Sequence, residues 1–248
     1  GDDPFARVDE LDLRVALLPI LSGHLAVDTV VLRGMALNLA RNEAGRTNWE
    51  DLASGEAKPE EDAAGGMPVD VRVEGVIVEN ASLIWDDRQA GTRYALTDLS
   101  VKTGAITLGR AIPVEIAMKL ASSAPPREMT LSLAAEVTAD EALQRFALED
   151  LALGLSASGE GLPAAGIDLE ASGRARYDTA AGTMAVEDFS VSGAGVQLDA
   201  ALNGKNMNEE PSITGPVNLR ESNLRQVLAL FGGELDTADP QALTSVSA

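Results

Sequence analysis

A short apolar pattern recurs along this chain and limits the folds that it can adopt. In each copy an apolar residue is followed three positions later by a second one and two positions after that by a third. In the full copies a Gly or Asn stands two positions further on, and apolar residues lie three and five positions beyond it, such as Leu37 and Leu39 in the first copy and Leu83 and Trp85 in the second. Full copies begin at Val27, Val73 and Val186, and half-copies begin at Leu96 and Leu148. Because period-2 alternation is typical of a β-strand with one buried face, the copies predict strands.

The three-residue step interrupts this alternation in every copy. A β-bulge absorbs one extra residue, so it would keep both apolar side chains on one face and bend the strand. Gly34, Asn80 and Gly193 follow the apolar runs, and these residue types tolerate positive φ. We expect the chain to reverse at each of them, so that each copy is a bent hairpin of two antiparallel strands.

The rest of the chain fits the same scheme. Strand-length segments, each with one apolar and one polar face, span residues 112–120, 130–137, 146–155, 167–177 and 212–219. Glycine, proline and acidic residues separate them. Repetition without a fixed period indicates a meandering sheet rather than a solenoid. We therefore predict a mainly β protein, with one long curved antiparallel sheet forming an open U-shaped groove and a few short helices.

We expect residues 1–248 to form a single β-groove fragment of a larger protein. Residues 53–68 are rich in Gly, Ala, Pro, Glu and Asp, which predicts a flexible acidic loop. Ser222 or Asn223 can cap a short helix that extends to residue 232, and residues 234–248 give no pattern. The chain has no apolar run of 18 residues and does not begin with Met. We therefore expect any membrane anchor or export signal to have been cut away.

The segment at 41–52 carries a local helix signal. Thr47 and Glu50 have the spacing of a capping box, so Asn48 to Leu52 should form one helical turn. Trp49 and Leu52 lie three residues apart and would share one face of that turn. We interpret this plug, defined by Thr47, Asn48, Trp49, Glu50 and Leu52, as a structural element that closes the apolar face near one end of the groove.

Composition excludes several classes of function. The net charge of −20 disfavours binding to nucleic acid. The chain has no cysteine and one histidine, His24, which leaves no thiolate or histidine cluster for a metal. Ser156 only loosely resembles a nucleophile elbow, and adjacent Asp86 and Asp87 would point to opposite faces of a strand. We expect no enzyme, no cofactor and no metal site.

The geometry of the predicted sheet suggests a binding surface. Aromatic residues make up only 3% of the chain, so a bent sheet of about ten or more strands has too few large side chains to fill its own concavity. Helices are too few to cover it. We therefore expect either a second layer or a groove for an apolar ligand. The lipid-facing candidates are Leu11, Leu13, Val15, Val71, Val73, Leu131, Leu133, Val137, Ile167, Leu169, Val196 and Leu198.

Three stretches carry a resemblance to a known family. LLPILSGHLAVDTVVLRGMALNLARNEAGRTNWEDL, VEGVIVENASLIWDD and NLRQVLALFG resemble segments of the AsmA family of bacterial envelope proteins. This resemblance implies the periplasmic region of a protein anchored in the inner membrane. It also implies kinship with TamB-like and other bridge-type lipid-transfer proteins, in which a β groove shields acyl chains.

The main hypothesis is therefore a lipid-transfer protein of outer-membrane homeostasis, whose groove shields phospholipid or other acyl chains in the periplasm. Envelope proteins are possible partners. The alternative is a non-lipid periplasmic scaffold that assists outer-membrane protein assembly by offering sheet edges to partner strands. A hydrolase would require activity that depends on Ser156 or His24.

Overall fold

The computed structural model describes residues 4–13, 15–16, 24–50, 70–220 and 222–223. Fourteen strands form one sheet and three form a second, smaller sheet, which confirms the mainly β fold class. Contacts divide the chain into one unit of Gly1–Thr107 and Met118–Ala124 and another of Leu108–Ala117 and Pro125–Ala248. The loop predicted at 53–68, the helix after Asn223 and the tail at 234–248 lie outside the described residues.

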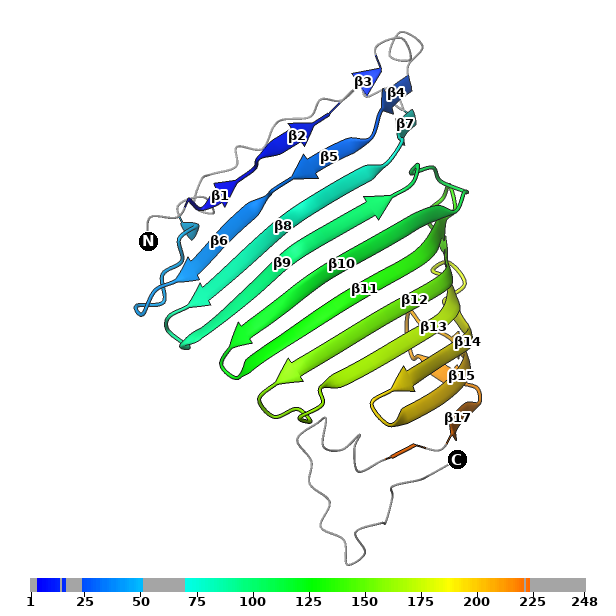
Figure 1. The fold of residues 1–248 in the computed structure, drawn as a ribbon. Coiled ribbons are helices and arrows are strands. Elements are labelled where there is room, and N and C mark those ends of the chain that lie inside the picture. Colours follow the sequence, from blue (N-terminus) through cyan, green and yellow to red (C-terminus); the bar gives the residue numbers. More distant parts are fainter. Residues whose placement is uncertain (1–3, 14, 17–23, 51–69, 221, 224–248) are drawn as a thin grey trace, which may run out of the picture. The chain divides into compact units, whose positions relative to one another are not determined.

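The first unit contains the strands from the amino-terminal part of the chain (Figure 1). These are β1 (Ala6–Arg7), β2 (Glu10–Asp12), β3 (Val15–Ala16), β4 (His24–Val27), β5 (Val30–Arg33), β6 (Ala36–Arg41), β7 (Asp70–Val73), β8 (Val76–Asp87) and β9 (Thr92–Thr103). Strands β1, β6, β8 and β9 are neighbours in that order, β2 pairs with β5, and β5 pairs with β8. Strands β3, β4 and β7 form the small sheet.

The two amino-terminal copies of the repeat pair with each other in parallel. Val27 is opposite Val73 in β4 and β7, and Val30 is opposite Val76 in β5 and β8. Leu37 is opposite Leu83 in β6 and β8. The residues that correspond in the repeat are thus direct cross-strand neighbours. The predicted antiparallel arrangement is wrong for these strands, because each copy pairs with the other copy rather than folding back on itself.

Gly34 and Asn80 do not reverse the chain as expected. Both have positive φ, at 61° and 54°. Yet β5 and β6, on either side of Gly34, both run parallel to β8, and Asn80 lies inside β8. A positive φ serves a bulge as well as a turn, and here it only kinks a strand that continues. Gly193 does end β14, and the chain reverses there as predicted.

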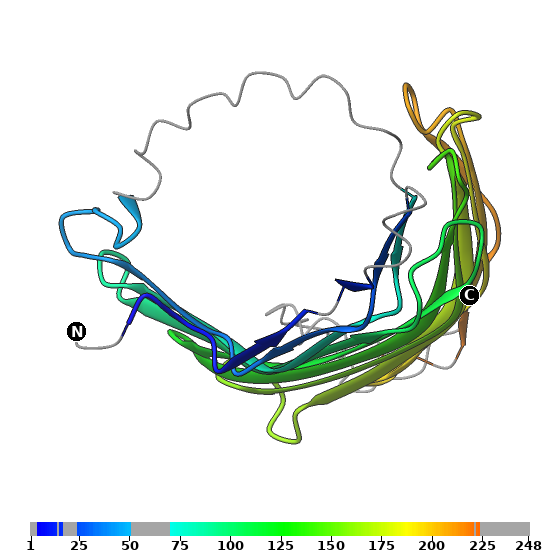
Figure 2. The same cartoon turned by 90° about the horizontal axis from the view of Figure 1, so that it is seen from above.

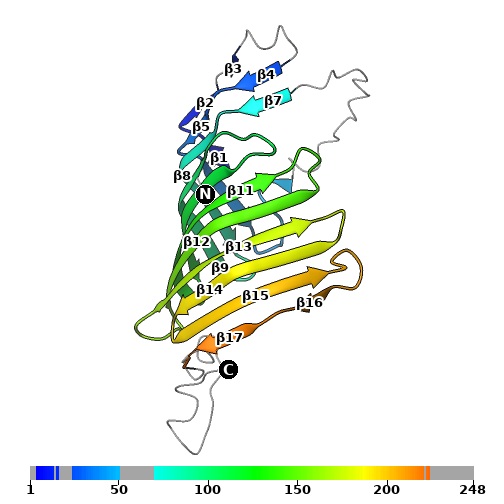
Figure 3. The ribbon, with the colours of Figure 1, turned by 90° about the vertical axis from the view of Figure 1, so that its right-hand side faces the viewer.

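The second unit is an antiparallel meander (Figure 3). It contains the first half of β10 (Ile112–Ser123), then β11 (Pro126–Ala139), β12 (Arg145–Gly159), β13 (Ile167–Asp178), β14 (Thr183–Gly193), β15 (Val196–Lys205), β16 (Ser212–Thr214) and β17 (Val217–Arg220). From β11 to β15 each strand pairs with the next along the chain. Both β16 and β17 pair with β15.

Three of the five predicted bulges lie at their three-residue steps, whereas at the steps from Val27 to Val30 and from Val73 to Val76 one strand ends and the next begins. The register of β12 with β13 shifts between Leu148 and Leu151, and Asp150 has a φ of 50°. The register of β14 with β15 shifts between Val186 and Phe189, where Asp188 has a φ of 47°. In the first unit the same shift surrounds Asp98 of β9. In all three places the extra residue leaves the flanking apolar side chains on one face.

The strands bend along their length in each unit, so each part of the sheet has a concave and a convex face (Figure 2). This agrees with the predicted open, curved sheet. Of the short helices that we predicted, the described residues include only the start of one, at Glu50. Leu52, which we assigned to the same turn, lies outside the described residues.

The bulge at Asp150 gives the first test. A β-branched side chain is strongly disfavoured at positive φ, whereas Asn tolerates it, and a left-handed residue costs roughly 1–2 kcal/mol. We expect Asp150→Val to lower the free energy of unfolding by about that amount relative to Asp150→Asn, as measured by urea denaturation. Equal stabilities of the two variants would contradict a left-handed bulge at this position.

Candidate functional site

The register of the second unit aligns apolar side chains in rows that cross the strands. Each row takes one residue from each successive strand, and the rows lie on the same face because the bulges correct the alternation. Three of these rows are Leu131, Leu155 and Leu169; Leu133, Leu153, Ala171, Val191 and Leu198; and Val137, Leu148, Ala175, Val186 and Leu202.

Seven of the lipid-facing candidates belong to this unit and are brought onto this one face. Leu131, Leu133, Val137, Leu169 and Leu198 lie in the rows above. Ile167 continues the face opposite Ala157, and Val196 lies opposite Gly193. That these side chains contact lipid stays a prediction, but the structure gives them a common surface.

The prediction missed the contribution of β12 and β14 to this face. Their side chains are Leu148, Leu151, Leu153, Leu155, Val186, Phe189 and Val191. The repeat pattern could have identified them, since these are its own apolar positions. Gly173 was also missed. A Cβ at this position would lie 3.0 Å from Cα of Phe189 and 3.2 Å from Cδ2 of its ring, so any other residue would have to displace Phe189.

Little covers the apolar face. In the part of the chain that the structure describes, the buried apolar residues are Ala81, Ala135, Ile167 and Ala200. The leucines and valines of the rows are only half-buried. A sheet normally buries its apolar face against a second layer. The register places these large side chains beside their cross-strand neighbours, and the described residues place no second layer over them.

The opposite face of the second unit is polar. The hydroxyl of Ser172 hydrogen-bonds that of Ser190 at 3.1 Å. Arg176 pairs with Glu149 at 2.9 Å, and Arg174 pairs with Glu187 at 3.3 Å. Hydrogen bonding to Asp188 raises the pKa of Arg174.

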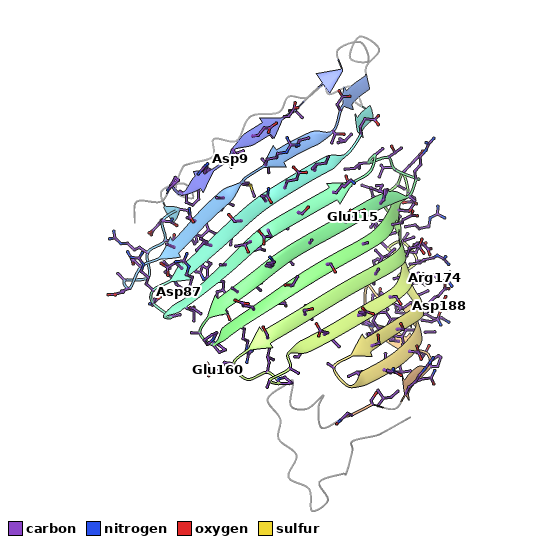
Figure 4. The ribbon with its side chains drawn as sticks, in the orientation of Figure 1. Asp9, Asp87, Glu115, Glu160, Arg174 and Asp188 are labelled. Atoms are coloured by element: carbon purple, nitrogen blue, oxygen red, sulfur yellow. The ribbon has the colours of Figure 1, made fainter. Side chains whose placement is uncertain are left out.

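Arg174 and Asp188 project from the outer side of the bend (Figure 4). Arg174 belongs to the polar face, because its cross-strand partner on β14 is Glu187. The polar face is therefore convex, and the apolar rows line the concave face of this unit.

The first unit carries an apolar face of the same kind. Leu37, Leu83 and Leu96 form one row across β6, β8 and β9. Leu39, Trp85 and Tyr94 form the next.

The remaining candidates lie toward the edges of the first unit. Leu11 is in the edge strand β2 and Leu13 follows it, and they are 64% and 57% exposed. Val73 ends β7 and is half-buried. Val15 is opposite Val27, and Val71 is opposite Leu25. By backbone register Val15, Val27 and Val73 lie in one row of the small sheet, whereas Leu11, Leu13 and Val71 are not in that row.

The plug is held mainly by Asn48. Its backbone N–H donates to the carbonyl of Ala40 at 3.0 Å, and its side-chain oxygen accepts from the N–H of Ala40 at 2.8 Å. Its side-chain amide donates to the carbonyl of Asn38 at 2.7 Å. Asn48 thus occupies hydrogen-bonding groups on the edge of β6, as a neighbouring strand would. Thr47 forms a bridge to Arg41.

Trp49 packs on Trp85, with ring centroids 5.3 Å apart and planes inclined by 49°. The Arg41 guanidinium lies over the Trp85 ring at 5.8 Å from its centroid. Trp85 belongs to an apolar row, so the plug does contact the apolar face. That the plug closes the apolar face near one end of the groove stays a prediction.

Asp87, at the end of β8, is the one charged residue that is buried among the described residues, at 4% exposure. It accepts hydrogen bonds from the Arg41 guanidinium, at 3.1 Å from Nε, and from the backbone N–H groups of Gln89 and Ala90. The Arg41 hydrogen bond is the main reason that the pKa of Asp87 is lowered. The ion pair between Arg41 and Asp87 thus links β6 to β8, which run parallel to each other.

Three of the residues considered for catalysis have hydrogen-bond or ion-pair partners among the described residues. Ser156 donates a 2.6 Å hydrogen bond to Asp168, its cross-strand neighbour on the polar face. His24 begins β4 in the first unit. Asp86 pairs with Arg88 at 3.1 Å, while Asp87 faces Arg41.

Comparison with known proteins identifies the family. A model of the AsmA family matches residues 2–213. The chain belongs to the AsmA family. This membership is consistent with a role in envelope lipid transport or envelope assembly. No curated protein and no solved structure gave a match. In the described part of this AsmA-family chain, no helix combines the length and apolar character that a membrane span requires.

The buried ion pair predicts an acid-sensitive fold. A carboxyl group whose pKa is lower in the folded state stabilises the fold above its unfolded pKa of about 4, and this contribution is lost as the pH falls through the folded pKa. We expect Asp87→Asn to be less stable than wild type at neutral pH but to lose less stability between neutral and acid pH. Urea denaturation across this range measures both effects.

Asp86→Asn is the matched control, because Asp86 neighbours Asp87 but pairs with the exposed Arg88. This variant should keep the acid dependence of wild type. An equal response of the two variants would show that Asp87 does not carry the effect.

Proposed function

We propose that this AsmA-family chain shields lipid acyl chains on its concave apolar face as part of envelope lipid transfer. The open rows of leucine and valine are the observation that carries the proposal. Burying a methylene group contributes about 0.8 kcal/mol, so a few contacts hold an acyl chain without a tight pocket. Weak, repeated binding sites suit a ligand that has to move along the sheet.

The chemistry of the two faces supports phospholipids as the ligand class. Acyl chains would contact the rows, while the headgroups would remain at the water-exposed strand ends. The net charge of −20 would not attract anionic headgroups, so apolar contact has to supply the affinity. We place the chain in the periplasm, as part of a protein anchored in the inner membrane and without a catalytic step. Family membership supports this placement.

The rival role, a scaffold that offers sheet edges to partner strands, has less support. Ile213 and Val217, in the last two strands, are 54% and 52% exposed, as an edge that receives a strand would be. However, β16 and β17 have three and four residues, and β1 and β2 have two and three. Gly215 and Pro216 separate β16 from β17. Short, interrupted edges are typical of sheets that avoid strand addition.

Leu133→Asp tests the proposal. The substitution places a charge in one of the apolar rows, where burying it against an acyl chain is costly. We expect the amount of lipid that co-purifies with the protein, measured by lipid extraction and mass spectrometry, to fall several-fold. The melting temperature is measured separately, so that loss of lipid can be distinguished from loss of fold.

Ala134→Asp is the matched control. Ala134 is the next residue on the same strand, lies on the polar face opposite Ala152, and would place the same charge in water. This variant should keep its lipid. Equal lipid content in the two variants, or no lipid in the wild-type protein, would argue against the proposal.

A further inference from the structure

A hollow with a mixed lining lies at one end of strands β6, β8 and β9 in the first unit, with Leu39, Ala40 and Ile84 among its apolar lining residues. Its volume is about 370 Å³. It is lined by Asn38 and Asn42, by Arg46 and Asn48 in the turn after β6, and by Asp86, Arg88 and Arg93 in the hairpin of β8 and β9. Asp86 and Arg93 are direct cross-strand neighbours. They alternate with Trp85 and Tyr94, so Asp86 and Arg93 belong to the face opposite the apolar rows, although Leu39 of the row of Trp85 also lines the hollow.

The hollow is cationic in an acidic protein. Three arginines line it against one carboxylate. Arg88 pairs with this carboxylate, Asp86, at 3.1 Å. Among the described residues, the structure gives no ion pair or side-chain hydrogen bond to the guanidinium groups of Arg46 and Arg93. These two exposed cations are therefore available to a ligand.

A third donor is available beside them. The side-chain oxygen of Asn42 accepts from the backbone N–H of Arg46 at 3.0 Å, which fixes the orientation of this amide and leaves its NH₂ group to donate. The amides of Asn38 and Asn48 are already used, because each donates to a backbone carbonyl. Arg46, Arg93 and Asn42 together offer donors, and the one carboxylate in the lining, Asp86, is paired with Arg88. Such a set of donors is suited to an oxyanion.

The overall negative charge does not prevent anion binding here. At an ionic strength of about 0.15 M the Debye length is about 8 Å, so most of the acidic surface is screened from the hollow. Close contacts with two guanidinium groups then dominate the interaction. A phosphate group fits this site better than a carboxylate, because its several oxygens can accept from donors on separate strands.

We propose that this hollow binds the phosphate group of an anionic ligand, either a phospholipid headgroup or a soluble phosphate. The headgroup assignment rests on the proposed function. The end of β8 connects the two faces of the sheet at this point, because the strand stops at Asp87, directly after Trp85 and Asp86. A lipid whose chains lie against the row of Trp85 could pass its headgroup around this strand end to the hollow.

The test compares Arg46→Gln/Arg93→Gln with Lys102→Gln/Arg110→Gln in the full chain. The control removes the same charge from exposed residues that do not line the hollow. Inorganic phosphate and glycerol 3-phosphate are titrated by calorimetry. We expect wild type and control to bind, and the Arg46/Arg93 variant to bind at least about tenfold more weakly, since it loses two charge-assisted contacts. Circular dichroism and melting temperature verify that both variants fold.

A second titration identifies the source of the phosphate. Vesicles of phosphatidylglycerol are compared with vesicles of the same lipid diluted in uncharged diacylglycerol. A parallel loss of vesicle and soluble phosphate binding in the Arg46/Arg93 variant supports a headgroup site. A loss for soluble phosphate alone supports a site for free phosphate. No binding by wild type, or no difference between the two variants, overturns the proposal, whatever the Leu133 and Ala134 variants show about acyl chains.

Discussion

The placement of one extra residue at each bulge determines which side chains share a face of this sheet. Without the bulge between Leu148 and Leu151, the later leucines of β12 would alternate onto the polar face and the rows would end in mid-strand. The bulge residues Asp98, Asp150 and Asp188 all adopt positive φ, and each follows a polar residue in the repeat. Bulges of this kind occur in both units, and they keep the apolar side chains of each strand on the same face as those of its neighbours.

The open apolar face follows from composition as much as from topology. Alanine and glycine occupy much of β13, where Ala171, Gly173 and Ala175 face the concave side. Such strands cannot fill a concavity by themselves, and the described residues contribute no second layer. On the convex face, ion pairs such as that between Arg176 and Glu149 join strands at the surface. Because exposed pairs contribute little free energy, backbone pairing and row contacts must hold the sheet together.

Much of the fold could be predicted from the sequence because its signals are local. Alternation identified the strands of the second unit, and the three-residue steps identified the bulges around Asp150 and Asp188. The parallel pairing of β5 and β6 with β8 could not be predicted in this way, since Gly34 and Asn80 suit a reversal as well as a kink. The repeat contained the missing information, because Arg41 and Asp87 occupy equivalent positions, 46 residues apart, and face each other. The role of Asn48 at the edge of β6 depends on contacts that no local pattern records.

Site-specific photocrosslinking along β12 tests the central claim most directly. A photoreactive amino acid is placed in turn at positions 148, 149 and 151–155, and the crosslinked products are identified as lipid or protein. The account predicts lipid at Leu148, Leu151, Leu153 and Leu155, and none at Glu149, Ala152 or Gly154, so that the alternation shifts phase at the bulge. Lipid at every position, or protein in place of lipid at the leucines, would contradict it.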